Sequence, residues 1–219
     1  MTVKLDLNDV SGMVFDCDGT LLDTLDAWRL AEAPLFAQIP FELTRAQEDE
    51  IHSAPIEEAA RIFHEAYGVM NSSEGVLAHL DDALLSYYRD IAEPLPGAVE
   101  LVEVANQRGI PCVVVSSSPR RYLEAGLERA GIADCFIRLI STEDVCLSKS
   151  NPAIYQIALD SLGSALDTTW AFDDAPYACE VMRAFGFKTV APANDADQKE
   201  IEAKAQAADY VVATLKDLL

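Results

Sequence analysis

The sequence has few basic residues and few histidines. It contains 16 lysines and arginines against 37 aspartates and glutamates, a formal charge of −21, and three histidines. This charge repels nucleic-acid backbones and anionic membrane surfaces, so we expect neither as a partner. It also repels a small anionic substrate. An enzyme acting on phosphoesters would therefore need a cation and local hydrogen-bond donors at its site.

Targeting and cysteine signals are also missing. The first residues lack the basic segment and apolar run of a secretion signal, and no stretch has the length of a membrane span. The five cysteines include no CxxC pair, which excludes a typical thiolate zinc site and gives no disulfide framework. We expect a cytoplasmic protein that is a monomer or a weak homodimer.

An alternation of apolar runs and helical patterns is what the sequence does contain. Gly12 to Phe15 is a short apolar run that reads as a buried strand. Further strands are predicted at 112–115, 136–140, 169–172, 187–190 and 210–212, and helices at 98–108, 119–130, 152–162 and 176–185. This order predicts an α/β fold with a doubly wound, mainly parallel, Rossmann-like sheet.

The segment from Thr24 to Ala92 has a different character. Apolar residues recur at helical spacing and prolines at positions 34, 40 and 55 punctuate it. We predict an all-helical insert of about four helices, with the clearest at 56–67, opened by Pro55, and at 76–91. The predicted domains are an α/β core of residues 1–23 and 95–219 and a helical cap of residues 24–94, with hinges at 23–26 and 94–97.

Polar side chains follow four of the predicted strands, and no other predicted strand is followed by residues of this kind. In chain order they are Asp16 and Asp18, Ser116 and Ser117, Lys149, and Asp173 and Asp174. Ligands of such sheets bind at the carboxyl ends of the strands. Four carboxylates meeting there cannot all stay ionised without a cation. Mg²⁺ fits these oxygen ligands better than zinc does, since the three histidines all lie in the insert.

These residue types suit phosphoryl transfer. Asp16 can attack phosphorus as a carboxylate nucleophile, and Asp18 can protonate the leaving oxygen and then activate water. Lys149, the Ser116 hydroxyl and the backbone N–H groups of the 16–20 turn can stabilise the charge of the transferring group.

Each signal also has a simpler interpretation. An Asp-x-Asp-Gly turn occurs in calcium loops, but the sixth and twelfth positions of such a loop are here Leu21 and Ala27. The 173–174 pair suits a helix start. Ser118 suits a helix cap before Pro119, and Lys149 alone could be a solvated surface lysine.

Four motifs resemble one known family. FDCDGTLLD is similar to the DxDGTxxD signature of haloacid dehalogenase-type phosphatases, and VVVSSSP, LSKSNPAIY and AFDDAPYA resemble its second, third and fourth motifs. The helical insert resembles the cap of the subgroup that contains phosphoglycolate phosphatase, sugar-phosphate phosphatases and β-phosphoglucomutase. Three departures are Ser148-Lys149-Ser150 in place of Gly-Lys-Pro, Ala175 in place of the serine of the fourth motif, and the lack of the glycine often found downstream.

The resemblance implies a role for each matching residue. Asp16 would be the nucleophile and Asp18 the acid/base. The implied metal ligands are Asp16, Asp18 through its backbone carbonyl, Asp173 and Asp174, and the implied phosphate contacts are Ser116 and Lys149 with Thr20 and Ser117 as secondary ones. Whether Asp173 binds the metal directly or through water is open.

We therefore predict a magnesium-dependent phosphatase that hydrolyses a small phosphomonoester, such as a sugar phosphate, through an aspartyl-phosphate on Asp16. A β-phosphoglucomutase-like phosphomutase would use the same motifs, but the specificity turn of the cap, which the resemblance places near 52–55, lacks the basic residue expected for a second phosphate. A catalytically silent binding or regulatory protein of the same fold would be expected to have lost Asp16 or Asp18, and both are present.

Overall fold

The computed structural model of the chain describes residues 4–54 and 56–219, so Pro55 and its predicted helix start lie outside it, as do the side chains of Asp49 and Ser53. The chain divides into two compact units. The core comprises the chain up to Thr24 and Ala92–Leu219, and the helical unit comprises Leu25–Ile91. These boundaries lie one and three residues from the expected ones. The roles of catalytic domain and cap stay predictions.

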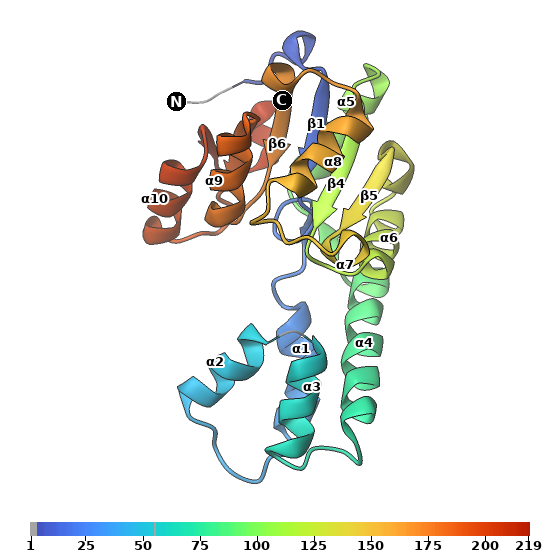
Figure 1. Ribbon diagram of the computed structural model, residues 1–219, viewed down its shortest axis with the longest axis vertical. Helices are drawn as coiled ribbons and strands as arrows, with labels where there is room; N and C mark the ends of the chain where they lie inside the picture. Colours follow the sequence, from blue (N-terminus) through green and yellow to red (C-terminus); the bar gives the residue numbers. More distant parts are fainter. Residues whose placement is uncertain (1–3, 55) are drawn as a thin grey trace. The chain divides into compact units, whose positions relative to one another are not determined.

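The core is built on a six-stranded sheet in the order β5-β4-β1-β6-β7-β8, in which all neighbouring strands are parallel (Figure 1). The strands are β1 (Gly12–Phe15), β4 (Cys112–Ser116), β5 (Arg138–Ser141), β6 (Thr169–Phe172), β7 (Lys188–Pro192) and β8 (Tyr210–Val212). The predicted doubly wound fold is thereby confirmed. The chain builds outward from β1 to one side and then to the other, so the topological switch point lies beside β1.

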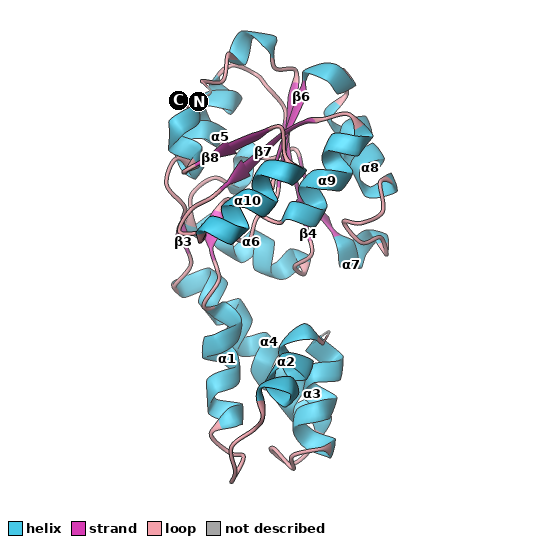
Figure 2. Cartoon of the chain, turned by 90° about the vertical axis from the view of Figure 1, so that its left-hand side faces the viewer, coloured by secondary structure: helices cyan, strands magenta, loops and turns pink. Residues whose placement is uncertain are grey.

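Helices cover both faces of this sheet (Figure 2). On one face lie α5 (Ala98–Gln107) and α6 (Arg120–Arg129), and on the other α8 (Ala153–Leu162), α9 (Pro176–Phe185) and α10 (Gln198–Ala207). The central strands are buried along their whole length, as their continuous apolar runs predict. Phe15 stacks on Phe172 of the neighbouring strand, with ring centroids 4.6 Å apart.

Two helices were not predicted. Helix α7 (Thr142–Val145) is a single turn, and α10 has the sequence QKEIEAKAQA, whose buried residues are Lys204 and Ala207. A buried face made of alanine and a lysine stem leaves no apolar periodicity to detect. The available signal was the capping box formed by Asp197 and Glu200.

The helical unit contains four α-helices among its described residues, in agreement with the expected number. They are α1 (Ala27–Phe36), α2 (Arg45–Ser53), α3 (Ile56–Glu65) and α4 (Ser73–Asp90). The unit has its own core, in which Leu35, Phe63 and Leu80 are fully buried. Pro34, one of the prolines that punctuate this segment, lies in the last turn of α1, where the helix continues for only two more residues.

The two predicted hinge segments overlap a short ladder. Strands β2 (Leu22–Asp23) and β3 (Glu93–Pro94) pair antiparallel within the core, with Leu22 opposite Pro94. Two residues are too few for a strand to show periodicity, so the ladder was not predicted. The chain enters and leaves the helical unit directly next to this ladder.

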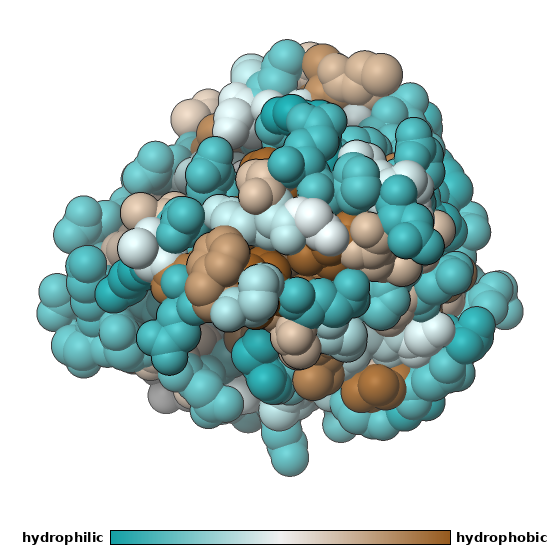
Figure 3. Space-filling view, turned by 90° about the horizontal axis from the view of Figure 1, so that it is seen from below, coloured by the Kyte–Doolittle hydropathy of each residue, from teal (hydrophilic) through white to brown (hydrophobic). Residues whose placement is uncertain are grey.

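Hydrophilic residues cover most of the face shown in Figure 3, with hydrophobic side chains in small areas between them. Over residues 4–54 and 56–219, none of the helices combines the length and the apolar character that a membrane crossing needs.

Candidate active site

The loop after β1 carries the first pair of predicted catalytic residues. The backbone N–H of Asp16 donates to the carbonyl of Phe172 at 2.8 Å, which ties the strand end to β6. The chain then turns sharply, because the N–H groups of Leu21 and Leu22 both donate to the carbonyl of Cys17. Asp16 is consequently buried, with 5% of its surface exposed, and Asp18 is half-buried.

Lys149 forms the centre of a buried ion-pair network. Its Nζ lies 2.7 Å from Asp16 Oδ1 and 2.5 Å from Asp173 Oδ2, and only 4% of the residue is exposed. Burial alone lowers the pKa of the ammonium group, but the two carboxylates outweigh this and raise the pKa well above its ordinary value. Lys149 therefore stays charged. The surface interpretation of this lysine is wrong.

Three carboxylates converge beside this lysine. Asp16, Asp173 and Asp174 each offer an oxygen within 4.8 Å of the others. Burial raises the pKa of Asp16, and although Lys149 lowers it, the neighbouring aspartates raise it further. Burial and the charge of Asp173 raise the pKa of Asp174 to about 6. The charges of Lys149 and, at Asp174, of Lys204 lower these pKa values but do not offset the effect of burial and like charge, and the all-oxygen donor set fits a hard divalent cation such as Mg²⁺.

Hydroxyl groups surround the second aspartate of the loop. Thr24 Oγ1 donates to Asp18 Oδ1 at 2.8 Å, and Ser118 Oγ donates to Asp18 Oδ2 at 2.7 Å. Ser116 Oγ also donates to Oδ2, at 3.2 Å, and accepts from the N–H of Ser118. The Asp18 carboxylate is therefore held on both oxygens by the strand ends of the core.

Two contacts lock the β1 loop against the neighbouring strands. Thr20 is fully buried, and its Oγ1 accepts from the N–H of Asp174 at 3.0 Å. Asn194 Nδ2 donates to the carbonyl of Gly19 at 2.8 Å. Gly19 has φ +77°, and a Cβ atom at this position would lie 2.6 Å from Asp174 Oδ2. Only glycine gives both the backbone conformation and the room that Asp174 occupies.

The structure brings six of the predicted site residues to one edge of the sheet: Asp16, Asp18, Ser116, Lys149, Asp173 and Asp174. Thr20 lies among them, but its hydroxyl braces the loop. Ser117 is exposed, and its carbonyl accepts from Thr142. The catalytic, phosphate-binding and metal-binding roles of these residues stay predictions.

Sequence reasoning missed three polar residues of this site. Ser118 was interpreted as a helix cap, but α6 begins at Arg120 with Pro119 at the cap position, and the Ser118 hydroxyl binds Asp18 instead. Thr24 carried no signal. Asn194 was missed because β7 was predicted to end at residue 190 but continues to Pro192, so a further strand end bears a polar residue.

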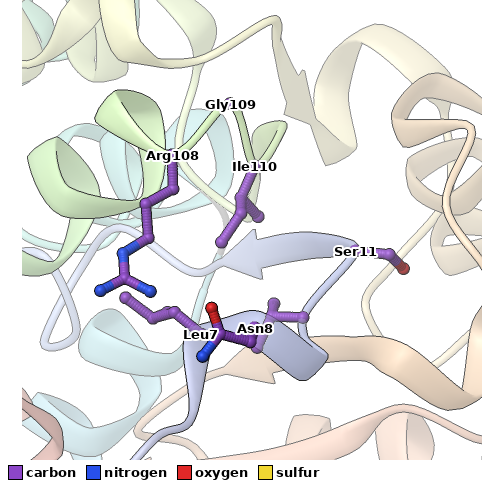
Figure 4. Close-up of a pocket in the computed structure, with 7 residues that line it drawn as sticks. Leu7, Asn8, Ser11, Arg108, Gly109 and Ile110 are labelled. Atoms are coloured by element: carbon purple, nitrogen blue, oxygen red, sulfur yellow. The ribbon is translucent and has the colours of Figure 1, made fainter.

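A hollow of about 470 Å³ lies at the opposite edge of the core sheet, before β1 and β4 (Figure 4). Arg108 extends beside Leu7 and Asn8 at its rim. The residues that line it include no carboxylate and no lysine: Leu7, Asn8, Val10, Ser11, Arg108, Gly109 and Ile110. It offers no carboxylate to act as the nucleophile or to hold a metal ion.

Comparisons with known proteins point to one family. A sequence model of the family described as haloacid dehalogenase-like hydrolase matches residues 10–186. Hexitol phosphatase B of Escherichia coli K12 is 26% identical, over 94% of this chain and 95% of its own length. Phosphoglycolate phosphatase of Rhodospirillum rubrum is 28% identical, over 81% and 77%. The crystal structure of β-phosphoglucomutase from Clostridium difficile, 17% identical, superposes with a TM-score of 0.71 over 96% and 93% of the two chains.

Proposed function

This chain belongs to the haloacid dehalogenase-like hydrolases, and from that premise we propose that it is a magnesium-dependent phosphatase of small phosphomonoesters. The observation that carries the proposal is the position of Asp16, which is buried between Lys149 and two further aspartates. Two of the similar proteins are named phosphatases of small phosphorylated metabolites, which supports this class of substrate. A cytoplasmic location, a monomer or weak homodimer, and the absence of nucleic acid and membrane partners stay predictions.

In this proposal Asp16, Asp174 and the backbone carbonyl of Asp18 hold the Mg²⁺ ion, with Asp173 bound to it directly or through water. The ion supplies positive charge for the phosphoryl oxygens and for the converging carboxylates. Lys149 orients Asp16 and favours its ionised form against the effect of burial, because its ammonium group lies 2.7 Å from the nucleophilic carboxylate and lowers its pKa.

The first step forms a bond between an Asp16 carboxylate oxygen and phosphorus and breaks the bond from phosphorus to the leaving oxygen. Asp18 donates a proton to that oxygen, so the leaving group departs as an alcohol. The backbone N–H groups of the 16–20 turn, Lys149 and the Ser116 hydroxyl stabilise the transferring group. Ser116 donates to Asp18 in the structure, and its hydroxyl must rotate to reach a phosphate oxygen.

The second step removes the phosphoryl group from Asp16. Asp18, now ionised, takes a proton from water, and the water oxygen attacks phosphorus while the bond to Asp16 breaks. Inorganic phosphate leaves and both aspartates return to their starting states. The Thr24 and Ser118 hydroxyls, which hold both oxygens of Asp18, fix the carboxylate for both proton transfers.

The test is phosphate release from an aryl phosphate, with and without Mg²⁺, by the wild type and by Asp16→Asn. We expect release that requires Mg²⁺ and disappears in the variant, because the amide keeps the shape of the side chain but cannot act as the nucleophile. Asp134→Asn is a matched control, since it removes one exposed carboxylate from η2 (Ala133–Cys135). Activity unchanged in Asp16→Asn would contradict the mechanism.

Product analysis separates the phosphatase from a phosphomutase with the same residues. A phosphatase releases inorganic phosphate in an amount equal to the substrate consumed, whereas a mutase returns the phosphoryl group to a sugar. Folded protein without activity towards either kind of substrate would favour the silent binding protein.

A further inference from the structure

Lys204 is a buried lysine that the proposed mechanism does not use. It lies in α10, which packs against α9, the helix that begins two residues after Asp174 (Figure 2). Only 7% of the residue is exposed, and its Nζ donates to the carbonyl of Pro192 at 2.8 Å. Over residues 4–54 and 56–219 it forms no ion pair with a carboxylate. Lysine is rarely buried without such a partner, because its ammonium group loses its hydration.

The carbonyl that binds Lys204 lies next to the acidic cluster. The N–H of Asp173, at the end of β6, donates to the carbonyl of Val190 in the neighbouring strand β7 at 3.2 Å. Asp174 follows directly after β6, and Pro192 is the last residue of β7. Neighbouring strands are about 4.8 Å apart, so Asp174 and Pro192 lie at the same level of the sheet. The ammonium group is therefore on the β7 side of Asp174.

The charge of Lys204 acts on this aspartate. Burial and the charge of Asp173 raise the pKa of Asp174, whereas Lys204 lowers it, and does so more than Lys149. Lys149 instead contacts Asp16 and Asp173. Two lysines thus compensate the three carboxylates of the cluster, one by direct contact with two of them and the other by its charge beside the third.

A purely mechanical role for Lys204 is the alternative. The clamped carbonyl of Pro192 comes just before Asn194, whose side chain holds the carbonyl of Gly19 in the β1 loop. The backbone N–H groups of residues 193 and 194 donate to the last carbonyl of β8 and to the next one, at 2.7 and 2.8 Å. These bonds hold the segment independently of the lysine, so its charge is the property left to explain.

We infer that Lys204 is a positioning residue of the metal site, whose fixed charge steadies Asp174 before the ion binds and repels the ion once it is bound. This inference rests on the metal site of the proposed function. Two cations near one carboxylate repel each other, and the repulsion is strong in a poorly hydrated interior. Removing the charge should therefore tighten Mg²⁺ binding. Loss of a mechanical clamp would weaken it, because a ligand that moves binds the ion less well.

Calorimetry of Mg²⁺ binding separates charge from clamp. Lys204→Gln keeps a donor for the carbonyl of Pro192 but has no charge, and Lys204→Met has neither. At pH 8, above the pKa of about 6 for Asp174, we expect the Mg²⁺ dissociation constant to fall by at least about threefold in Lys204→Gln. Lys199→Gln is the matched control, since it removes one exposed charge from the same helix. An unchanged or higher dissociation constant in Lys204→Gln, or an equal fall in the control, would overturn the inference.

A double-mutant cycle without metal tests the link to Asp174 directly. In EDTA at pH 8, Lys204→Gln should lower Tm by about 3 °C more in the wild-type background than in Asp174→Asn, because the asparagine has no charge to compensate. For Lys199→Gln the two shifts should be the same. Equal shifts for Lys204→Gln in the two backgrounds would show that the lysine does not act on Asp174 and would overturn the inference.

Failure of the proposed function gives a different pattern. If the wild type binds no Mg²⁺, the metal-dependent mechanism is contradicted, but the cycle in EDTA needs no ion: a difference between the two backgrounds supports the action of Lys204 on Asp174, and its absence overturns it. If Mg²⁺ binds but no phosphate is released from any substrate, the phosphatase proposal fails and both measurements on Lys204 keep their meaning.

Discussion

Lys149 Nζ lies 2.7 Å from Asp16 Oδ1 although the two residues are 133 positions apart in the chain. Both are almost completely buried. A buried carboxylate remains ionised only when a cation compensates for the lost hydration. This ion pair therefore favours the charged form of the proposed nucleophile, whose pKa burial raises, and four predictions concern it and its neighbours.

Replacing Lys149 with methionine removes the cation that contacts both Asp16 and Asp173. We expect phosphate release to be lost and, in EDTA, the free energy of unfolding to fall by about 3–5 kcal/mol, because buried charges lose their partner. Urea denaturation with and without Mg²⁺ measures this. Lys188→Met is the control: Lys188 lies at the start of β7 with its ammonium group over the ring of Trp170, so turnover should persist. Equal activity loss in both variants would contradict the assignment.

The metal-free protein should lose stability as pH rises. The pKa of Asp174 is about 6 in the folded state and 3.8 ordinarily, so the folded state binds more protons between these values. The free energy of unfolding should fall by up to about 3 kcal/mol from pH 4 to pH 7. Thermal unfolding in EDTA measures it. With saturating Mg²⁺ the free energy of unfolding should instead rise with pH, since the ion binds the ionised carboxylate. In Asp174→Asn the free energy of unfolding should depend less on pH. A stabilisation by Mg²⁺ that does not change with pH would contradict the assignment of Asp174 as a metal ligand.

Asp18→Asn should affect substrates according to their leaving group. A nitrophenolate can leave without a proton, whereas an alkoxide needs one. Loss of the acid should therefore lower the rate of the first step for an alkyl phosphate by a factor of about 10² to 10⁴. With nitrophenyl phosphate we expect a rapid burst of nitrophenol followed by slow turnover, because the base for the second step is also missing. Stopped-flow absorbance measures the burst. Equal loss on both substrates, with no burst, would show that Asp18 has another role.

Gly19→Ala should weaken metal binding beyond its effect on folding. The added Cβ meets Asp174 Oδ2 at 2.6 Å, and the backbone has φ +77°. Gly131→Ala is matched in φ, at +73°, but meets nothing within 4 Å. Both variants should lose about 1–2 kcal/mol of stability, and only Gly19→Ala should raise the Mg²⁺ concentration needed for half-maximal activity. An equal Mg²⁺ requirement in the two variants would argue against contact between Gly19 and a metal ligand.

Much of the core could be predicted from local patterns. Strand β6 and helix α9 have the predicted bounds, because a buried parallel strand is a continuous apolar run and a proline marks the helix start. Helix α10 could not be predicted, since its buried face consists of small residues and a lysine. The contacts of Ser118 and Thr24 with Asp18 could not be predicted either. A serine or threonine hydroxyl can pair with many groups, and the sequence does not show which of them lies nearby in the folded chain.

The sequence by itself determined which polar residues follow the strands at the proposed site. Short-range properties decide this: an apolar run ends, a carboxylate or hydroxyl follows, and the spacing within one loop is set by covalent geometry. Asp16, Lys149 and Asp174 were identified in this way. Tertiary structure alone decided the strand order that places β1 between β4 and β6. It also decided that Lys149 is buried between two aspartates. Long-range contacts of this kind depend on how distant segments pack, which no local pattern specifies.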